Sequence, residues 1–142
     1  MHPHAGPALV RMTQLIGDRF EAIAAELGVG AREGRLLVVA SHGPLPVGRL
    51  GQVVRVGKST MTGILARMVE DGLVTREPDP ADRRVALIAP TKQGRAIATT
   101  LQSRVRSFVL ELLEPLDEGQ REQLAGLLGT VIARADVVLP PE

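Results

Sequence analysis

Residues 57–91 read GKSTMTGILARMVEDGLVTREPDPADRRVALIAPT, and this stretch decides the fold. Its first part, Lys58–Met68, repeats apolar residues at helical spacing, and Gly72 follows as a stop signal. Two short β-prone runs come next, Val74–Glu77 and Val85–Ile88, and a loop that contains prolines separates them. The stretch therefore predicts a helix followed by a β-hairpin.

The predicted helix has two unlike faces. At about 100° per residue, Met61, Ile64, Leu65 and Met68 share the inner side, where we expect them to pack in the core. The outer side is small, hydroxylated and basic, which suits the major groove of duplex DNA, about 12 Å wide. Taken alone, the same pattern describes an ordinary surface helix. The residues expected to face DNA are Lys58, Ser59, Thr60, Thr62, Gly63 and Arg67.

The order of motifs resembles the MarR family of bacterial transcriptional regulators, over residues Leu36 to Leu128. The motifs that carry the resemblance are the helix, Gly72-Leu73-Val74, Arg76, Asp79-Pro80-x-Asp82-Arg83-Arg84, an apolar strand, and Thr91-x-x-Gly94 before a long helix. The resemblance implies a mainly α fold with a small β wing: a winged helix-turn-helix core with N- and C-terminal dimerisation helices. It also implies a transcriptional regulator, expected to be a repressor.

The resemblance assigns roles to the hairpin tip. The arginine that matches Arg84 reaches into the minor groove, and the aspartate that matches Asp82 braces it by an ion pair; Arg83 lies beside them. A narrow minor groove attracts a guanidinium, and an arginine that is already oriented loses less entropy on binding. The alternative is an exposed ion pair worth about 0–1 kcal/mol to stability and nothing more.

Helices are expected on both sides of this core. The spacing predicts helices over Ala8–Leu27, Val47–Val53 and Asp117–Val137, and a helix that Thr91 caps and that ends near Leu113. Residues 31–41 could form a helix or a buried strand, because Leu36–Ala40 is rich in β-branched side chains. Gly43-Pro44 and the resemblance favour the helix. Pro46 and Gly57 stand where the family usually has a serine or threonine cap.

We expect residues 1–30 and 91–142 to form dimerisation helices around a DNA-binding core of residues 31–90. Their apolar stripes exceed what a core of this size covers, and the family dimerises through these helices. A two-fold homodimer predicts a pseudo-palindromic operator. The alternative reading is a winged-helix module that binds protein and not DNA.

Composition and charge agree with this interpretation. The net charge is +1, but its distribution is uneven. Residues 1–48 carry four basic and four acidic side chains, residues 49–95 nine basic and five acidic, and residues 96–142 four basic and seven acidic. The positive charge therefore lies in the predicted core. The chain has no cysteine, which excludes disulfides, thiolate zinc sites and cysteine-based peroxide sensing. No apolar run approaches the about 20 residues of a membrane span, and no signal peptide is apparent, so a cytoplasmic location is expected.

The sequence gives little support for catalysis, a metal or a cofactor. Gly57-Lys58-Ser59-Thr60 resembles the end of a P-loop, but Gln52 stands where that motif needs its first glycine. His2 and His4 are a weak metal pair in a terminal segment, and we predict no metal site. Family members commonly respond to small anionic or aromatic ligands, so a small-molecule effector is an open expectation. Residues considered for its pocket are Met12, Arg19, Phe20, Arg35, His42 and Phe108.

Overall fold

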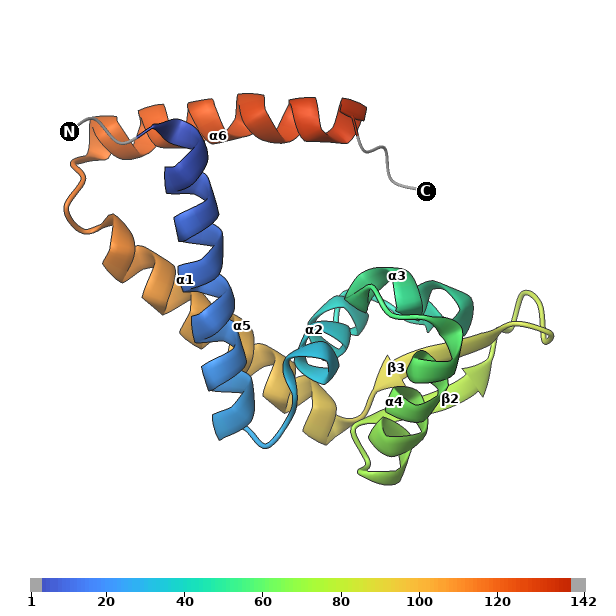
Figure 1. Ribbon diagram of the computed structural model, residues 1–142. Coiled ribbons are helices and arrows are strands. Elements are labelled where there is room, and N and C mark those ends of the chain that lie inside the picture. Colours follow the sequence, from blue (N-terminus) through green and yellow to red (C-terminus); the bar gives the residue numbers. More distant parts are fainter. Residues whose placement is uncertain (1–3, 139–142) are drawn as a thin grey trace. The chain divides into compact units, whose positions relative to one another are not determined.

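The computed structural model describes the backbone of residues 4–138 and the side chains of residues 4–135. Helices and strands follow one another as expected of a winged helix-turn-helix core with long helices before and after it (Figure 1). The chain divides into two units, residues 1–106 and 107–142. The elements are α1 (Ala5–Glu26), α2 (Ala31–Ala40), β1 (Leu45–Pro46), a 3-10 turn (Val47–Arg49), α3 (Leu50–Val54), α4 (Lys58–Glu70), β2 (Val74–Pro78), β3 (Ala86–Pro90), α5 (Lys92–Leu113) and α6 (Glu118–Val138).

The main core lies within residues 1–106 and consists almost entirely of aliphatic side chains and methionine. It joins α2, α3, α4, the wing strands and the first turns of α5. The inner face predicted for α4 is confirmed, since Met61, Leu65 and Met68 are buried there and Ile64 packs against the cluster. Burial of this face fixes which side of α4 stays in contact with solvent.

Residues 31–40 form helix α2 and not a buried strand. Gly30 precedes the helix in an extended conformation, and Leu36, Leu37 and Ala40 are buried along one side of it. Tertiary packing therefore overrides the β preference of the valines in this run. Gly34 is also buried, and a Cβ there would lie 3.0 Å from Leu101 Cδ2, so this glycine lets α2 approach α5 closely.

The sheet has three antiparallel strands in the order β1-β3-β2. Strand β2 pairs with β3 from Val74 opposite Pro90 to Pro78 opposite Ala86. The sequence did not predict β1, because two residues are too few for an alternation pattern. Pro46 in β1 lies opposite Leu87, on an edge strand, where the missing N–H of proline is tolerated.

Most predicted boundaries shift by one to three residues. Helix α1 begins at Ala5, before the predicted Ala8, and strand β3 begins at Ala86 because Val85 belongs to the wing loop. Such shifts are common, because the hydrogen bonds at the ends of an element depend on its neighbours. The Thr91 cap of α5 is confirmed, since the Gly94 N–H donates to Thr91 Oγ1 at 3.1 Å.

Helices α1 and α5 meet in a second, smaller cluster within residues 1–106. Ile23, Ala24 and Leu101 are fully buried there, and Phe20 packs against them. Outside this cluster, Glu26 on α1 accepts a hydrogen bond from the Arg104 guanidinium on α5. The ion pair lowers the pKa of Glu26 below its ordinary value.

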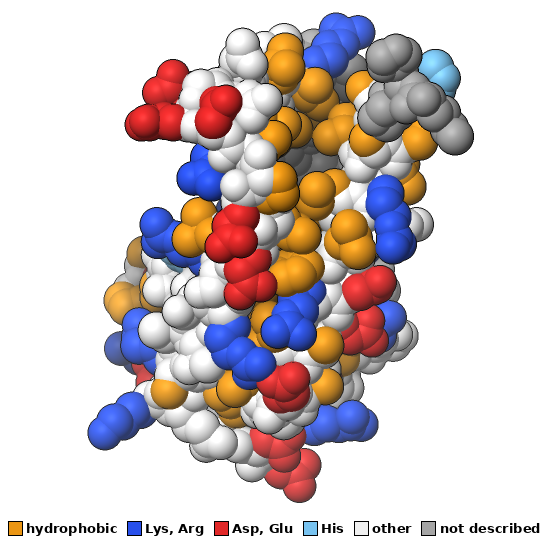
Figure 2. Space-filling model, turned by 90° about the vertical axis from the view of Figure 1, so that its left-hand side faces the viewer, with side chains coloured by type: hydrophobic (Ala, Val, Ile, Leu, Met, Phe, Trp, Pro, Cys, Tyr) orange, Lys and Arg blue, Asp and Glu red, His pale blue; other side chains and the backbone are white. Residues whose placement is uncertain are grey.

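The second unit contains the end of α5 and helix α6. Asp117 and Gln120 form a reciprocal cap at the start of α6: the Gln120 N–H donates to Asp117 Oδ1 at 2.9 Å, and the Asp117 N–H donates to Gln120 Oε1 at 3.0 Å. Helix α6 exposes Leu127, Val131 and Ile132. Hydrophobic side chains exposed on one face of the molecule are visible in Figure 2.

Candidate nucleic-acid interface

Helix α4 holds its outward residues on a rigid, well-packed element. Its N-cap is Gly57, with φ −69° and ψ 164° and no side-chain cap, as expected for a glycine at this position. The buried inner face anchors the helix, so the opposite side is fixed in orientation. All the residues predicted to face DNA are exposed: Lys58, Ser59, Thr60, Thr62, Gly63 and Arg67.

The end of α4 is equally well defined. Gly72 adopts φ 71°, a conformation that favours glycine. Its N–H donates to Val69 O at 3.1 Å, and the Leu73 N–H donates to Met68 O at 2.9 Å. These two bonds form a Schellman motif, which ends the helix and turns the chain into β2.

Helix α3 and the turn that follows it contain two features that the sequence analysis missed. Among the described residues, Arg55 is the only one other than glycine that has a positive φ; its φ is 55° and its ψ is 49°. A turn of this kind usually carries glycine, so no signal marked it. Gly51 is needed for close approach, since a Cβ there would lie 2.9 Å from Val56 O.

A hollow of about 720 Å³ lies between α3, α4 and β2. Three cationic residues line it, Arg55, Lys58 and Arg76, together with Thr62. Its described lining residues include no acid, so the potential there is positive. The hollow thus joins two predicted DNA-facing residues of α4 to Arg76 of the wing strand.

Arg67 lies elsewhere. It lines a smaller hollow with Gly28, Gly30 and Glu33 from the connection between α1 and α2 and the start of α2, and with Asp71 at the end of α4. The structure therefore places Arg67 and Thr62 at different hollows. This smaller hollow has two acidic lining residues, Glu33 and Asp71, whereas the described lining of the hollow between α3, α4 and β2 has none.

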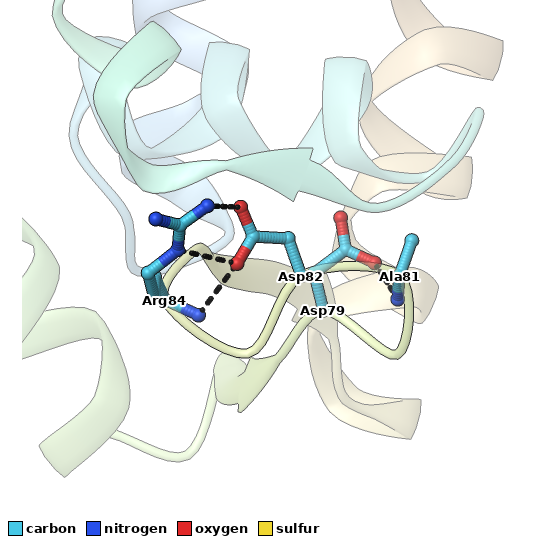
Figure 3. Close-up of polar contacts among 4 residues, drawn as sticks. All are labelled: Asp79, Ala81, Asp82 and Arg84. Carbon is cyan, nitrogen blue, oxygen red and sulfur yellow. Dashed lines mark hydrogen bonds and ion pairs between the residues drawn. The ribbon is translucent and has the colours of Figure 1, made fainter.

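The wing tip forms a compact set of hydrogen bonds (Figure 3). Asp82 Oδ1 accepts bonds from the Arg84 backbone N–H at 3.1 Å and from Arg84 Nε at 3.0 Å, while Asp82 Oδ2 accepts one from Arg84 Nη2 at 3.1 Å. The Arg84 side chain remains 90% exposed despite this bidentate pair. The expected ion pair is thus present, and it orients a cation that stays accessible.

The ion pair shifts the pKa of both partners. Hydrogen bonds from the Arg84 side chain and backbone lower the pKa of Asp82 below its ordinary value of 3.8. The same carboxylate raises the pKa of Arg84. Both groups are therefore charged throughout the neutral range.

Asp79 is a wing residue to which the sequence analysis assigned no role. Its Oδ1 accepts the Ala81 N–H at 2.9 Å (Figure 3), and its own N–H donates to Val85 O at 2.8 Å. The first bond forms an Asx turn, and the second closes the loop beyond the last ladder pair. The Asp79-Pro80 pair is a signal for such a turn, and it could have identified this role.

Of the residues considered for an effector pocket, the structure brings Arg35 and Phe20 together. The Arg35 guanidinium carbon lies 5.8 Å from the centroid of the Phe20 ring. His42 Nδ1 lies 2.8 Å from Val38 O, in the turn after α2. These contacts do not by themselves form a ligand site.

The described residues contain no group of three or more metal-ligating side chains. His2, half of the histidine pair considered above, lies outside the described residues. No described helix is both long and apolar enough to span a membrane.

The core joins α2, α3 and α4, a hairpin wing follows it, and the outward side of α4 is exposed. These features define a winged helix-turn-helix protein. Residues 23–85, which include the helix-turn-helix and most of the wing, match the sequence profile of the MarR family. The segment that carries the helix-turn-helix and most of the wing is therefore of the MarR type, and the proteins that match the chain are transcriptional regulators and not enzymes.

Similar proteins agree with this placement. The transcriptional activatory protein BadR of Rhodopseudomonas palustris is 37% identical over 70 residues, which are 49% of this chain and 40% of BadR. The homoprotocatechuate degradative operon repressor of Escherichia coli is 25% identical over 134 residues, 94% of this chain and 90% of the repressor. A mutant of MarR from E. coli complexed with operator DNA has a TM-score of 0.68 at 25% identity, covering 89% of this chain and 91% of MarR.

Proposed function

We propose that this protein represses transcription by binding a pseudo-palindromic operator as a homodimer. The observation that carries the proposal is the wing-tip arginine, Arg84, which Asp82 holds in place while it stays 90% exposed. An arginine in this state is suited to a narrow minor groove, because its orientation costs little entropy and the groove concentrates negative potential. We assign Asp82 the role of a brace and Arg83 that of a phosphate contact.

We assign base and phosphate contacts in the major groove to the outward side of α4. Thr62 and Lys58 lie beside Arg55 and Arg76 around the α3–α4–β2 hollow, which gives this side positive charge. The Thr62 hydroxyl donates to Lys58 O at 2.9 Å, so its oxygen is left to accept a hydrogen bond from a base. Ser59, Thr60 and Gly63 are exposed on the same helix. Arg67 remains a proposed contact, since it is exposed in the last turn of α4 and its long side chain can extend from the helix.

The homodimer is proposed from exposed apolar side chains at both ends of the chain. Leu9, Val10 and Met12 are exposed on α1, and Leu127 and Ile132 on α6. Exposed apolar groups at helical spacing favour burial against a second copy. Repression is favoured over activation because the repressor named above matches over 94% of this chain. Since the target is chromosomal DNA, we propose that the protein acts in the cytoplasm.

Titration into duplex DNA tests this function. The purified protein is added to the DNA upstream of its own gene and to an unrelated duplex of equal length, each at two salt concentrations. We expect binding to both that weakens with salt, and tighter binding to the upstream DNA. Failure to bind either duplex would instead support the winged-helix protein-interaction module. A response to a small-molecule effector stays a separate prediction, read as a ligand-induced change in the same titration.

A further inference from the structure

Three elements meet at the hydroxyl of Thr91. Thr91 Oγ1 donates to Gly72 O at 2.6 Å and lies 3.2 Å from Leu73 O, while it accepts the Gly94 N–H at 3.1 Å. The Thr91 N–H donates to Leu73 O at 3.0 Å. This set of bonds, called here the Thr91 clip, ties the turn after α4 and the start of β2 to the first turn of α5.

The clip depends on close backbone approach. A Cβ on Gly94 would lie 2.1 Å from Leu73 O and 2.9 Å from Leu37 Cδ2. The first of these neighbours is backbone that has little room to move, so the contact holds α5 directly against the Gly72-Leu73 turn. Gly94 and Leu73 are both buried, and the two bonds of the Thr91 hydroxyl that involve them are partly shielded from water, whereas the bond to Gly72 O is exposed.

The position of the clip gives it a mechanical consequence. The ladder between β2 and β3 begins with Val74 opposite Pro90, and the clip lies directly outside this pair. It therefore closes the base of the wing hairpin. It also fixes the last turn of α4, because the Schellman bonds at Gly72 and Leu73 end the helix at the same two residues.

We propose that the Thr91 clip sets the geometry in which α4 and the wing are presented to DNA. Thr91 and Gly94 are positioning residues in this proposal, because neither lies on the outward side of α4 or at the wing tip. The inference rests on the proposed DNA binding and deepens it. Without the clip, Arg84 and the outward residues of α4 would sample several relative positions, and fewer of them would meet their groove at once.

The first test compares operator preference with folding. Thr91→Val keeps the shape of the side chain and removes the hydroxyl, whereas Thr91→Ser keeps the hydroxyl. Thr100→Val is the matched control, because Thr100 is exposed on the same helix. Well below the melting temperature of every variant, we expect Thr91→Val to lose about five- to tenfold of the preference for operator over unrelated duplex. Thr91→Ser and Thr100→Val should keep that preference.

The second test does not need DNA. Since the chain has no cysteine, Ser59→Cys and Gln102→Cys allow one nitroxide label on α4 and one on α5. The labelled protein is diluted with an excess of unlabelled protein, so that a dimer contains one labelled protomer, and pulsed electron resonance then gives the distribution of distances between the two labels. We expect a narrow distribution in the labelled parent, a broad one with Thr91→Val, and a narrow one again with Thr91→Ser. Gly94→Ala should displace the distribution, and if that variant does not fold, the Thr91 variants still decide.

The outcomes separate the two proposals. If the parent protein shows no preference for operator, the proposed function fails, and the distance distributions alone decide the clip. Broadening with Thr91→Val and recovery with Thr91→Ser support it. The clip proposal is overturned if Thr91→Val leaves the distances unchanged, or if it leaves operator preference at the parent level where the parent has one.

Discussion

Arg84 combines two properties that seldom occur together in a surface cation. Three hydrogen bonds join it to Asp82, yet its side chain is 90% exposed. An exposed ion pair contributes little to stability, because water screens both charges. The value of the pair therefore lies in orientation, and its effect should appear in binding and not in melting temperature.

Replacing Arg84 should separate charge from shape. Arg84→Ala should weaken operator binding and reduce the salt slope by about one unit, because one cation is lost. Arg84→Lys should restore the slope more fully than the affinity, since an ammonium is strongly hydrated and lacks the planar fork. Operator affinity across a salt series measures both effects. Parent-like binding by Arg84→Ala would show that the wing tip does not contact DNA.

Two acidic residues of the wing, Asp79 and Asp82, should strengthen operator binding although their negative charge by itself repels DNA. Asp82→Ala and Asp79→Ala each remove a negative charge, which by itself favours DNA, but they release Arg84 and the Asx turn. We expect both to weaken operator binding while the melting temperature changes little. Glu77→Ala is the control, an exposed acid on β2. If all three variants bind more tightly, simple charge repulsion accounts for the wing.

The bracing pair should be insensitive to pH in the neutral range. The pKa of Asp82 is lowered below its ordinary value of 3.8, so its stabilising effect is fully present above that value and is lost as pH falls through the lowered pKa. Operator affinity should therefore not change between about pH 8 and pH 5 on account of the wing. Asp82→Asn, which resembles the protonated carboxyl, should weaken binding at pH 7. Fluorescence anisotropy at several pH values tests both statements.

At the scale of elements, the periodicity of apolar residues predicted the helices well, but strand β1 and the turn at Arg55 depend on tertiary contacts that the sequence does not show. The buried face of α4 followed from spacing alone, because burial and the 3.6-residue period are directly linked. Strand β1 could not be predicted, since its two residues are defined by pairing with β3. The left-handed Arg55 was equally invisible, because nothing in its side chain marks a positive φ.

Helix α4 also shows where sequence reasoning about the site stops. A helical wheel groups Arg67 with the outward residues, but the hollow that Arg67 lines is formed in part by Gly28, Gly30 and Glu33, 34 or more positions earlier in the chain. No local pattern contains that contact. The wing tip, by contrast, was predictable because Asp82 and Arg84, which bond each other, are two residues apart in the sequence.

The role of Arg67 can be tested on the helix itself. If Arg67 contacts a base, Arg67→Ala should cost about 1–3 kcal/mol and relax sequence preference; a phosphate contact would weaken all duplexes alike. Thr62→Val tests the other hollow, and Arg95→Ala on α5 is an exposed control. Electrophoretic mobility shifts with operator and unrelated duplex distinguish these cases. Unchanged binding by Arg67→Ala would limit the interface to the side of α4 that carries Thr62.

At the scale of the whole molecule, large apolar side chains on α1 and α6 remain exposed to solvent. Leu127 is 68% exposed, Ile132 59% and Val10 60%, although the interior of residues 1–106 is densely packed. Burying apolar area contributes about 25 cal/mol per Å², so side chains of this size favour a partner surface. Charge agrees, because residues 96–142 carry a net charge of −3 while residues 49–95 carry +4. An acidic terminal segment suits contact with another protein chain better than contact with DNA.

Substitution on α6 tests the dimer without removing any element. Leu127→Glu places a charge at an exposed position, so the single chain should still fold, but burial of that charge against a second copy would be strongly unfavourable. We expect sedimentation equilibrium to show a dimer for the parent and dissociation for Leu127→Glu at micromolar concentration. Because a monomer contacts a single half-site, operator affinity should fall far more than the affinity for an isolated half-site.

Gln123→Glu adds the same charge at an exposed position that is already polar, and it should remain dimeric. A parent protein that sediments as a monomer, or a Leu127→Glu variant that stays dimeric, would show that α6 does not form the interface, and the pseudo-palindromic operator would lose its structural basis.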